Sequence, residues 1–169
     1  MPDPDYLAAD FSPAGDAVVA RMAIVLDAAP GEVWSALTEP DQFVQWLAPG
    51  SIELRQGGAA RLDFVDSGIV IDSTVSAIEP GRLLEYSWSR PGEPDRPLRY
   101  GLEPQGEGTR LTLELRVPAG EDAARSAAGW AAHLEMLAGA LMGVPMKFPF
   151  DVFKAARAGY QAQLAPAAG

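Results

Sequence analysis

The stretch GTRLTLELRVPAGEDAARSAAGWAAHLEMLAGALM, residues 108–142, decides the fold. Its first ten residues alternate between apolar and polar side chains, which is the period of a half-buried strand. Pro118 ends that pattern, and Glu121 and Asp122 place negative charge where a helix begins. The apolar residues that follow recur at helical spacing along one stripe: Trp130, Leu134, Leu137 and Leu141. The sequence therefore predicts a strand followed by one long amphipathic helix.

Short alternating runs fill residues 51–117 ahead of this helix, separated by turn signals such as Glu79-Pro80-Gly81. Strands joined by short turns predict an antiparallel meander. Before the meander, residues 17–27 are β-branched and apolar and predict a further strand. Pro30 then begins one short helix, and Pro40 ends it and opens a second.

These elements predict an α+β fold of the helix-grip type. We expect a curved antiparallel sheet of about six or seven strands wrapped around a long C-terminal helix, with two short helices after the first strand. The chain divides into a flexible N-terminal extension over residues 1–15, the helix-grip domain over 16–143, and a C-terminal extension with a short helix over 144–169.

An apolar cluster lies in the C-terminal extension and at the end of the domain before it, and it consists of Met142, Met146, Phe148, Phe150 and Phe153. This cluster either packs on its own domain, as simple packing or as a lid, or buries itself against a second subunit. A homodimer through the C-terminal extension therefore stays open as an alternative.

Composition excludes several classes of function. The chain has 169 residues and no cysteine, so it suits a single domain and has no disulfide, thiolate metal ligand or cysteine nucleophile. The net charge of −10 repels phosphate backbones, so nucleic acid is not an expected partner. The N-terminus carries acids and prolines where a signal peptide needs basic and apolar residues, and the apolar helical stretch is interrupted by His133 and Glu135. We expect a cytoplasmic protein without membrane insertion.

Large rings recur on the predicted inner faces of several elements. Such rings either fill a core or line a pocket for a flat apolar ligand. The candidate ligand-binding residues are Phe43, Trp46, Phe64, Ile71, Tyr86, Trp88, Tyr100, Trp130, His133 and Leu137.

His133 is the only histidine and lies at the edge of the apolar stripe. It either acts as a general base or ligand-orienting group, with Tyr86, Tyr100 or Asp72 as partners, or is a structural histidine. A single histidine without cysteine cannot form a His/Cys metal site, and we expect neither a metal nor a cofactor.

Three segments carry a resemblance to a known family: residues 27–34 (DAAPGEVW), residues 80–88 (PGRLLEYSW), and residues 108–113 (GTRLTL) with Trp130 after them. In order and spacing they resemble the SRPBCC (START-like) superfamily, and within it the branch of homologues of the activator of heat shock protein 90 ATPase. The resemblance spans residues 17–142. It implies a helix-grip fold with a cavity between the sheet and the long helix.

The resemblance leaves the function broad, because the superfamily includes lipid and hormone binders, aromatic polyketide cyclases and co-chaperone domains. Our first hypothesis is a non-enzymatic binder of a small hydrophobic molecule. The second is a cyclase- or hydrolase-like enzyme that uses His133 and polar groups of the cavity. The third is a co-chaperone-like interaction module whose acidic surface meets a basic client.

Overall fold

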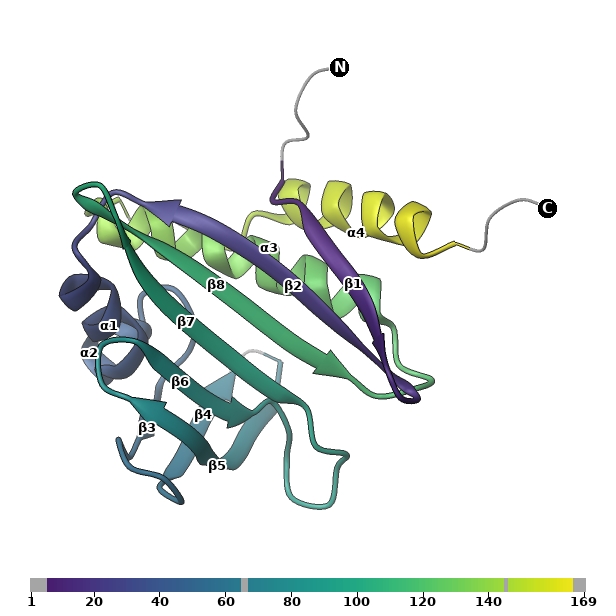
Figure 1. Ribbon diagram of the computed structural model, residues 1–169, viewed down its shortest axis with the longest axis horizontal. Helices are drawn as coiled ribbons and strands as arrows, with labels where there is room; N and C mark the ends of the chain where they lie inside the picture. The colour runs from purple at the N-terminus through teal and green to yellow at the C-terminus, as the bar shows by residue number, and fades with distance from the viewer. Residues whose placement is uncertain (1–5, 65–66, 145, 166–169) are drawn as a thin grey trace.

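The computed structural model describes residues 6–64, 67–144 and 146–165. Within these ranges, one eight-stranded antiparallel sheet has the order β1-β2-β8-β7-β6-β5-β4-β3 (Figure 1). The strands are β1 Ala9–Ala14, β2 Ala17–Leu26, β3 Gly50–Ile52, β4 Ala59–Phe64, β5 Ile69–Glu79, β6 Leu83–Ser87, β7 Pro97–Gln105 and β8 Gly108–Val117. The predicted meander and the α+β helix-grip class are confirmed, with eight strands instead of six or seven.

The helices are α1 Pro30–Thr38, α2 Pro40–Phe43, α3 Ala123–Leu141 and α4 Phe150–Leu164. A proline occupies the first turn of α1 and of α2, where its missing N–H costs nothing. The Asp122 side chain caps α3 by accepting a hydrogen bond from the backbone N–H of Arg125 at 3.0 Å. No helix among the described residues combines the length and the apolarity needed to span a bilayer.

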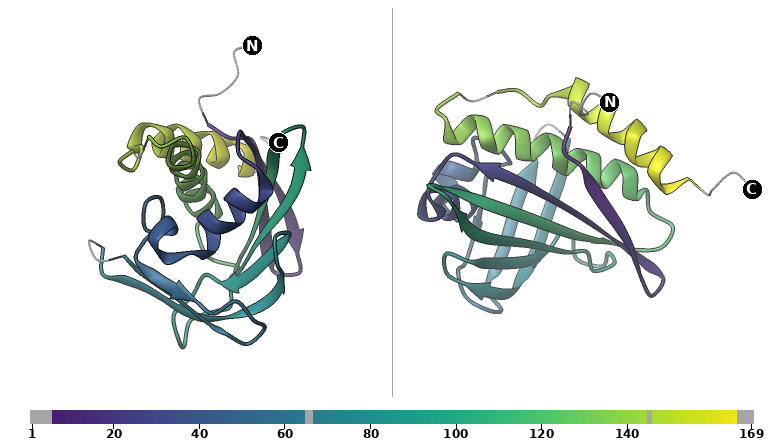
Figure 2. Two further views of the ribbon diagram at one scale, coloured as in Figure 1. Left: turned by 90° about the vertical axis from the view of Figure 1, so that its left-hand side faces the viewer. Right: turned by 45° about the horizontal axis from the view of Figure 1, so that its top comes forward.

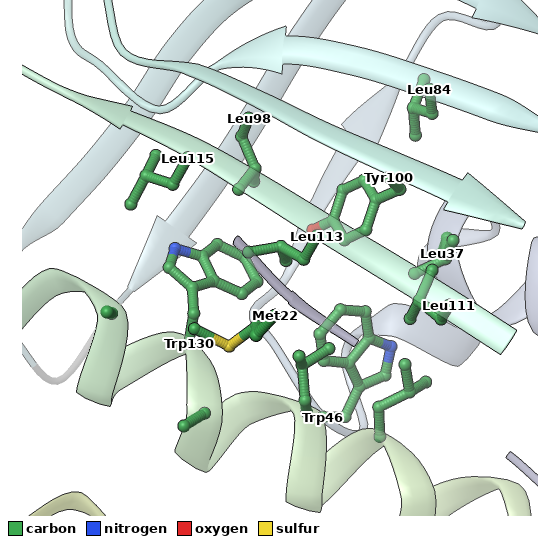
Figure 3. Close-up of a cluster of buried hydrophobic side chains, with 14 of the residues drawn as sticks. Met22, Leu37, Trp46, Leu84, Leu98, Tyr100, Leu111, Leu113, Leu115 and Trp130 are labelled. Carbon is green, nitrogen blue, oxygen red and sulfur yellow. The ribbon is translucent and has the colours of Figure 1, made fainter. Parts of the chain in front are cut away.

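The hydrophobic core lies between the hollow face of the curved sheet and α3, which runs along that hollow (Figure 2). Alternate residues of β8 face inward, and Leu111, Leu113 and Leu115 are at most 2% exposed. From α3, the stripe of Trp130, Leu134 and Leu137 belongs to the same buried core. Figure 3 shows Trp130 among the leucines of β8. The alternating face of β8 and the apolar stripe of α3, both predicted from the sequence, therefore pack against each other in one interface.

Residues 9–14 correct the expectation of a loose N-terminal extension. They form β1, which pairs with β2 from Ala9 opposite Met22 to Ala14 opposite Ala17. Gly15, with φ of 66°, opens the tight turn between the two strands. Pro13 fits because β1 lies at the edge of the sheet, where a strand does not need every N–H group for pairing. Residues 1–5 of the expected extension lie outside the described residues.

The C-terminal helix packs on its own domain. It lies against α3 and beside β1, as two views show (Figures 1 and 2). The Tyr160 hydroxyl donates to the Leu7 carbonyl, and the Gln163 side-chain amide donates to the Ala9 carbonyl at 2.7 Å. The Tyr6 ring stands edge-on to Tyr160 at 5.5 Å. The two ends of the described chain therefore contact and stabilise each other. A homodimer through the C-terminal extension stays a prediction.

Candidate functional site

Aromatic side chains from the sheet, from the loop after β6, from α3 and from the link between α3 and α4 meet in one network of ring contacts. We call it the aromatic cluster; it consists of Phe64, Tyr86, Trp88, Tyr100, Trp130, His133 and Phe148. Neighbouring ring centroids in it are 4.8 to 6.4 Å apart, the range in which edge-to-face and tilted pairs attract.

The aromatic cluster has a buried floor and a half-buried mouth. The floor is Tyr86, Tyr100 and Trp130, which are 1%, 1% and 3% exposed. The mouth consists of the half-buried rings of Phe64, Trp88, His133 and Phe148. Trp130 joins the two, because its ring lies 6.1 Å from that of Tyr100 and 4.8 Å from that of Trp88. The network thus leads from the surface into the core.

Strand register places the two floor tyrosines side by side. Leu84 of β6 lies opposite Tyr100 of β7, and Tyr86 lies opposite Leu98. Tyr86 and Tyr100 are therefore diagonal neighbours on the hollow face of the sheet. Their hydroxyl oxygens are 3.3 Å apart. Burial raises the pKa of both hydroxyls well above the ordinary value of 10, so both stay protonated at neutral pH.

His133 is held in one tautomer. Its Nδ1 lies 3.0 Å from the carbonyl oxygen of Trp46, which can only accept, so Nδ1 carries the proton and Nε2 keeps its lone pair. The ring is flanked by Phe64, Trp130 and Phe148 at 6.1, 5.8 and 5.4 Å. Burial lowers the His133 pKa below 6.5, although the bond to Trp46 opposes that shift. The imidazole is therefore neutral at physiological pH.

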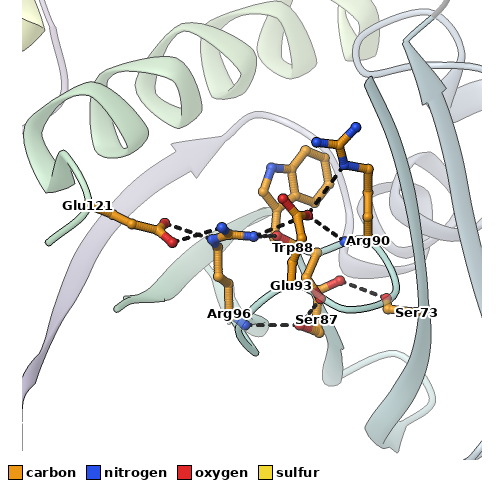
Figure 4. Close-up of polar contacts among 8 residues, drawn as sticks. Ser73, Ser87, Trp88, Arg90, Glu93, Arg96 and Glu121 are labelled. Carbon is orange, nitrogen blue, oxygen red and sulfur yellow. Dashed lines mark hydrogen bonds and ion pairs between the residues drawn. The ribbon is translucent and has the colours of Figure 1, made fainter. Parts of the chain in front are cut away.

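An ion pair ties the loop after β6 to the beginning of α3. Arg96 donates to both carboxylate oxygens of Glu121, at 2.7 and 2.8 Å, and its Nη1 donates to the Trp88 carbonyl at 3.3 Å (Figure 4). The bond to Glu121 raises the pKa of Arg96. The Ser87 hydroxyl accepts from the Arg96 backbone N–H at 2.9 Å. These contacts fix the backbone that carries Trp88 at the mouth.

Phe148 comes from the link between α3 and α4 and covers His133. The link folds back on α3 at Gly139, whose carbonyl accepts from the Val144 N–H at 2.8 Å. A Cβ at position 139 would lie 2.7 Å from the Val144 carbonyl oxygen, so this close approach needs glycine. Sequence reasoning identified Phe148 as part of an apolar cluster but missed it as a site residue. The signal was the run of large apolar side chains that follows the α3 stripe.

The remaining sequence candidates contribute no ring contact to this network among the described residues. Phe43, Trp46, Ile71 and Leu137 are buried in the core. Trp46 meets the aromatic cluster through its carbonyl and directs its indole N–H to the Ala36 carbonyl at 2.8 Å.

Asp72 was one of three alternative partners of His133, and the structure places its side chain elsewhere. Its carboxylate is exposed and lies 3.5 Å from the Arg61 guanidinium. The parity of β5 turns it away from Ile71 and the core. Among the described residues, no group of three His, Asp or Glu side chains gathers as a metal site would require.

Side chains occupy the space between the sheet and α3, where a cavity was expected (Figure 3). Two surface hollows lie elsewhere. One, of about 360 Å³, lies between β2 and the facing ends of α3 and α4, and Val18, Ala124 and Leu164 help to line it. The other, of about 250 Å³, lies on the outer face of the sheet around Arg82 and Leu102. Within residues 6–64, 67–144 and 146–165, the structure thus shows an aromatic path that leads into a core filled by side chains.

Comparisons with known proteins agree with this architecture. Residues 27–142 match the family model described as Activator of Hsp90 ATPase homolog 1-like protein. No curated protein matches. The crystal structure of CalU16 from Micromonospora echinospora is 26% identical and covers 98% of this chain and 100% of its own, with a TM-score of 0.77. The solution structure of the protein encoded by gene BPP1335 from Bordetella parapertussis is 27% identical, over 99% and 97%, with a TM-score of 0.70.

A third solved structure is more similar in sequence over a shorter length. DynU16, described as a putative protein in the dynemicin biosynthetic locus, is 32% identical. The match covers 74% of this chain and 48% of DynU16, with a TM-score of 0.67.

Proposed function

We propose, from the premise that the chain belongs to the Activator of Hsp90 ATPase homolog 1-like family, that it binds a small hydrophobic molecule between the sheet and α3. The observation that carries this proposal is the aromatic cluster, in which half-buried rings at the mouth lead to a buried floor. A flat apolar molecule takes the place of Phe148, packs against Trp88 and extends the ring contacts to the floor.

The energetics suit a ligand of two or three fused rings. Burying about 250 Å² of apolar surface contributes about 6 kcal/mol at about 25 cal/mol per Å². Moving Phe148 aside costs part of this free energy, so we expect a Kd of roughly tens to hundreds of micromolar for a bare hydrocarbon. Phe148 lies in a link with exposed apolar neighbours, Met142 at 72% and Val144 at 63%, and therefore moves at small cost.

Binding is favoured over catalysis by the surroundings of His133. General acid–base chemistry needs a second polar group converging on the reacting atom. Here Nδ1 is engaged by the Trp46 carbonyl, and the rings that flank His133 are carbocyclic or indole rings. DynU16 is described as a putative protein in a biosynthetic locus. The match to it also favours a small-molecule ligand over the basic protein client of the third hypothesis.

Naphthalene tests the proposal directly, with heat of binding as the readout. We expect one saturable site in the wild-type protein and at least a tenfold loss of affinity in Trp88→Leu, because that ring lines the path. Trp34→Leu is the matched control, since Trp34 is also half-buried but lies on α1. Absence of binding to the wild type, or equal losses in both variants, would overturn the proposal.

A further inference from the structure

The floor of the aromatic cluster holds two hydroxyl groups that cannot fully satisfy each other. The oxygens of Tyr86 and Tyr100 lie 3.3 Å apart, and either can donate. A phenol has one proton, so one hydroxyl donates to the other, and the second still has a proton to give. Among the described residues, no acceptor other than the first oxygen forms a hydrogen bond with it.

Both hydroxyls are far from bulk water. Tyr86 and Tyr100 are each 1% exposed, beneath Trp88 and Trp130. A buried donor without an acceptor costs free energy, whereas two phenylalanines of the same shape would avoid that cost. The remaining proton is therefore available to an acceptor atom at this position.

We propose that the Tyr86–Tyr100 pair is the polar anchor of the ligand site and that the ligand is a neutral, mainly aromatic molecule with a carbonyl oxygen. The carbonyl accepts the free proton of the pair while the ring system contacts Trp88 and Trp130. This inference rests on the proposed function and adds the functional group that the ligand carries.

The charges around the pair explain why the acceptor is neutral. Arg99, between Leu98 and Tyr100 on β7, points to the outer face, where it pairs with Glu85 at 2.8 Å. A carboxylate at the floor would therefore be a buried charge without a cation, which is costly. A carbonyl needs only a donor, and a hydroxyl that already accepts one hydrogen bond is a stronger donor.

The test compares 1-tetralone with tetralin, which share one ring skeleton and differ in a single C=O or CH₂ group. Calorimetry gives both affinities for the wild type, Tyr86→Phe, Tyr100→Phe and the double variant. The affinity ratio of ketone to hydrocarbon should fall by roughly three- to tenfold in the double variant, the worth of one net hydrogen bond. Each single variant keeps one hydroxyl donor, so its ketone-to-hydrocarbon affinity ratio should lie between that of the wild type and that of the double variant. The double variant should fold with an unchanged or raised Tm, because it removes the unmatched donor.

An infrared measurement distinguishes a hydrogen bond to the ligand carbonyl from apolar packing of the ligand rings. The C=O stretching band of bound 1-tetralone should lie at lower frequency in the wild type than in the double variant. Equal losses for both ligands, or a band that does not move, would mean that the free proton is satisfied otherwise, for example by a buried water. The inference would then be wrong while ligand binding stands. If the wild type binds neither molecule, the proposed function fails and the inference fails with it.

Discussion

At the scale of single residues, His133 combines a fixed tautomer with a lowered pKa. Its Nδ1–H donates a hydrogen bond to the Trp46 carbonyl, and burial among rings disfavours the charged imidazolium form. A lone histidine at the edge of an apolar stripe could be identified as a candidate from the sequence. Its partner could not, because a backbone carbonyl 87 residues away leaves no pattern in side-chain types.

The lowered pKa of His133 predicts a pH dependence of stability. The unfolded chain binds the proton near pH 6.5 and the folded chain only at lower pH, so this contribution is complete above pH 6.5 and is lost as pH falls. His133→Asn removes the titration, and its amide can still donate to Trp46. Urea unfolding between pH 7 and 5 should show a steeper loss in the wild type, by at most about 1.4 kcal/mol per pH unit. Parallel curves for the two proteins would contradict this.

At the scale of elements, α3 contains two glycines in opposite situations. A Cβ at Gly129 meets no atom within 4 Å, whereas one at Gly139 meets the Val144 carbonyl oxygen at 2.7 Å. Gly129 therefore only weakens the helix, and Gly139 allows the link to fold back over its end.

Alanine at the two positions should act in opposite directions. Gly129→Ala should raise the free energy of unfolding by about 0.5–1 kcal/mol, since alanine favours the helix and costs nothing in packing. Gly139→Ala should give no such gain and should speed amide exchange at Val144, whose N–H bonds to Gly139. Chemical denaturation and hydrogen exchange measure the two effects. An equal gain in stability in both variants would show that the link does not depend on Gly139.

Elements with a local period could be predicted from the sequence, and those held by distant contacts could not. The alternation in β8 and the stripe of α3 repeat within a few residues, so they predicted the helix-grip fold. The strand β1 was missed because ADFSPA contains a proline and lacks a clear alternation, although the Gly15-Asp16 pair is a hairpin signal. The position of Phe148 depends on a link without any period.

At the scale of the whole molecule, the two ends of the described chain stabilise each other. Tyr160 of α4 packs its ring against Tyr6 and Phe11 and donates its hydroxyl proton to the Leu7 carbonyl. The edge strand β1 is therefore held by β2 on one side and by α4 on the other. Neither contact could be predicted, since each joins residues about 150 positions apart.

Truncating Tyr160 should loosen both ends together. Tyr160→Ala should cost about 3 kcal/mol, because it leaves a cavity beside Tyr6 and Phe11. It should also speed amide exchange in β1. Tyr160→Phe keeps the ring and should cost only about 1 kcal/mol for the lost hydrogen bond. Thermal unfolding and hydrogen exchange provide the measurements, and unchanged protection of β1 in the alanine variant would show that α4 does not hold it.

The indole N–H signals of the four tryptophans test ligand binding at the aromatic cluster most directly. Naphthalene is added stepwise while ¹H–¹⁵N spectra are recorded, with each signal assigned by a Trp→Phe variant. The account predicts large, saturable shifts for Trp88 and Trp130 and a stationary signal for Trp34 on α1. Signals of Trp88 and Trp130 that move no further than that of Trp34 would contradict it.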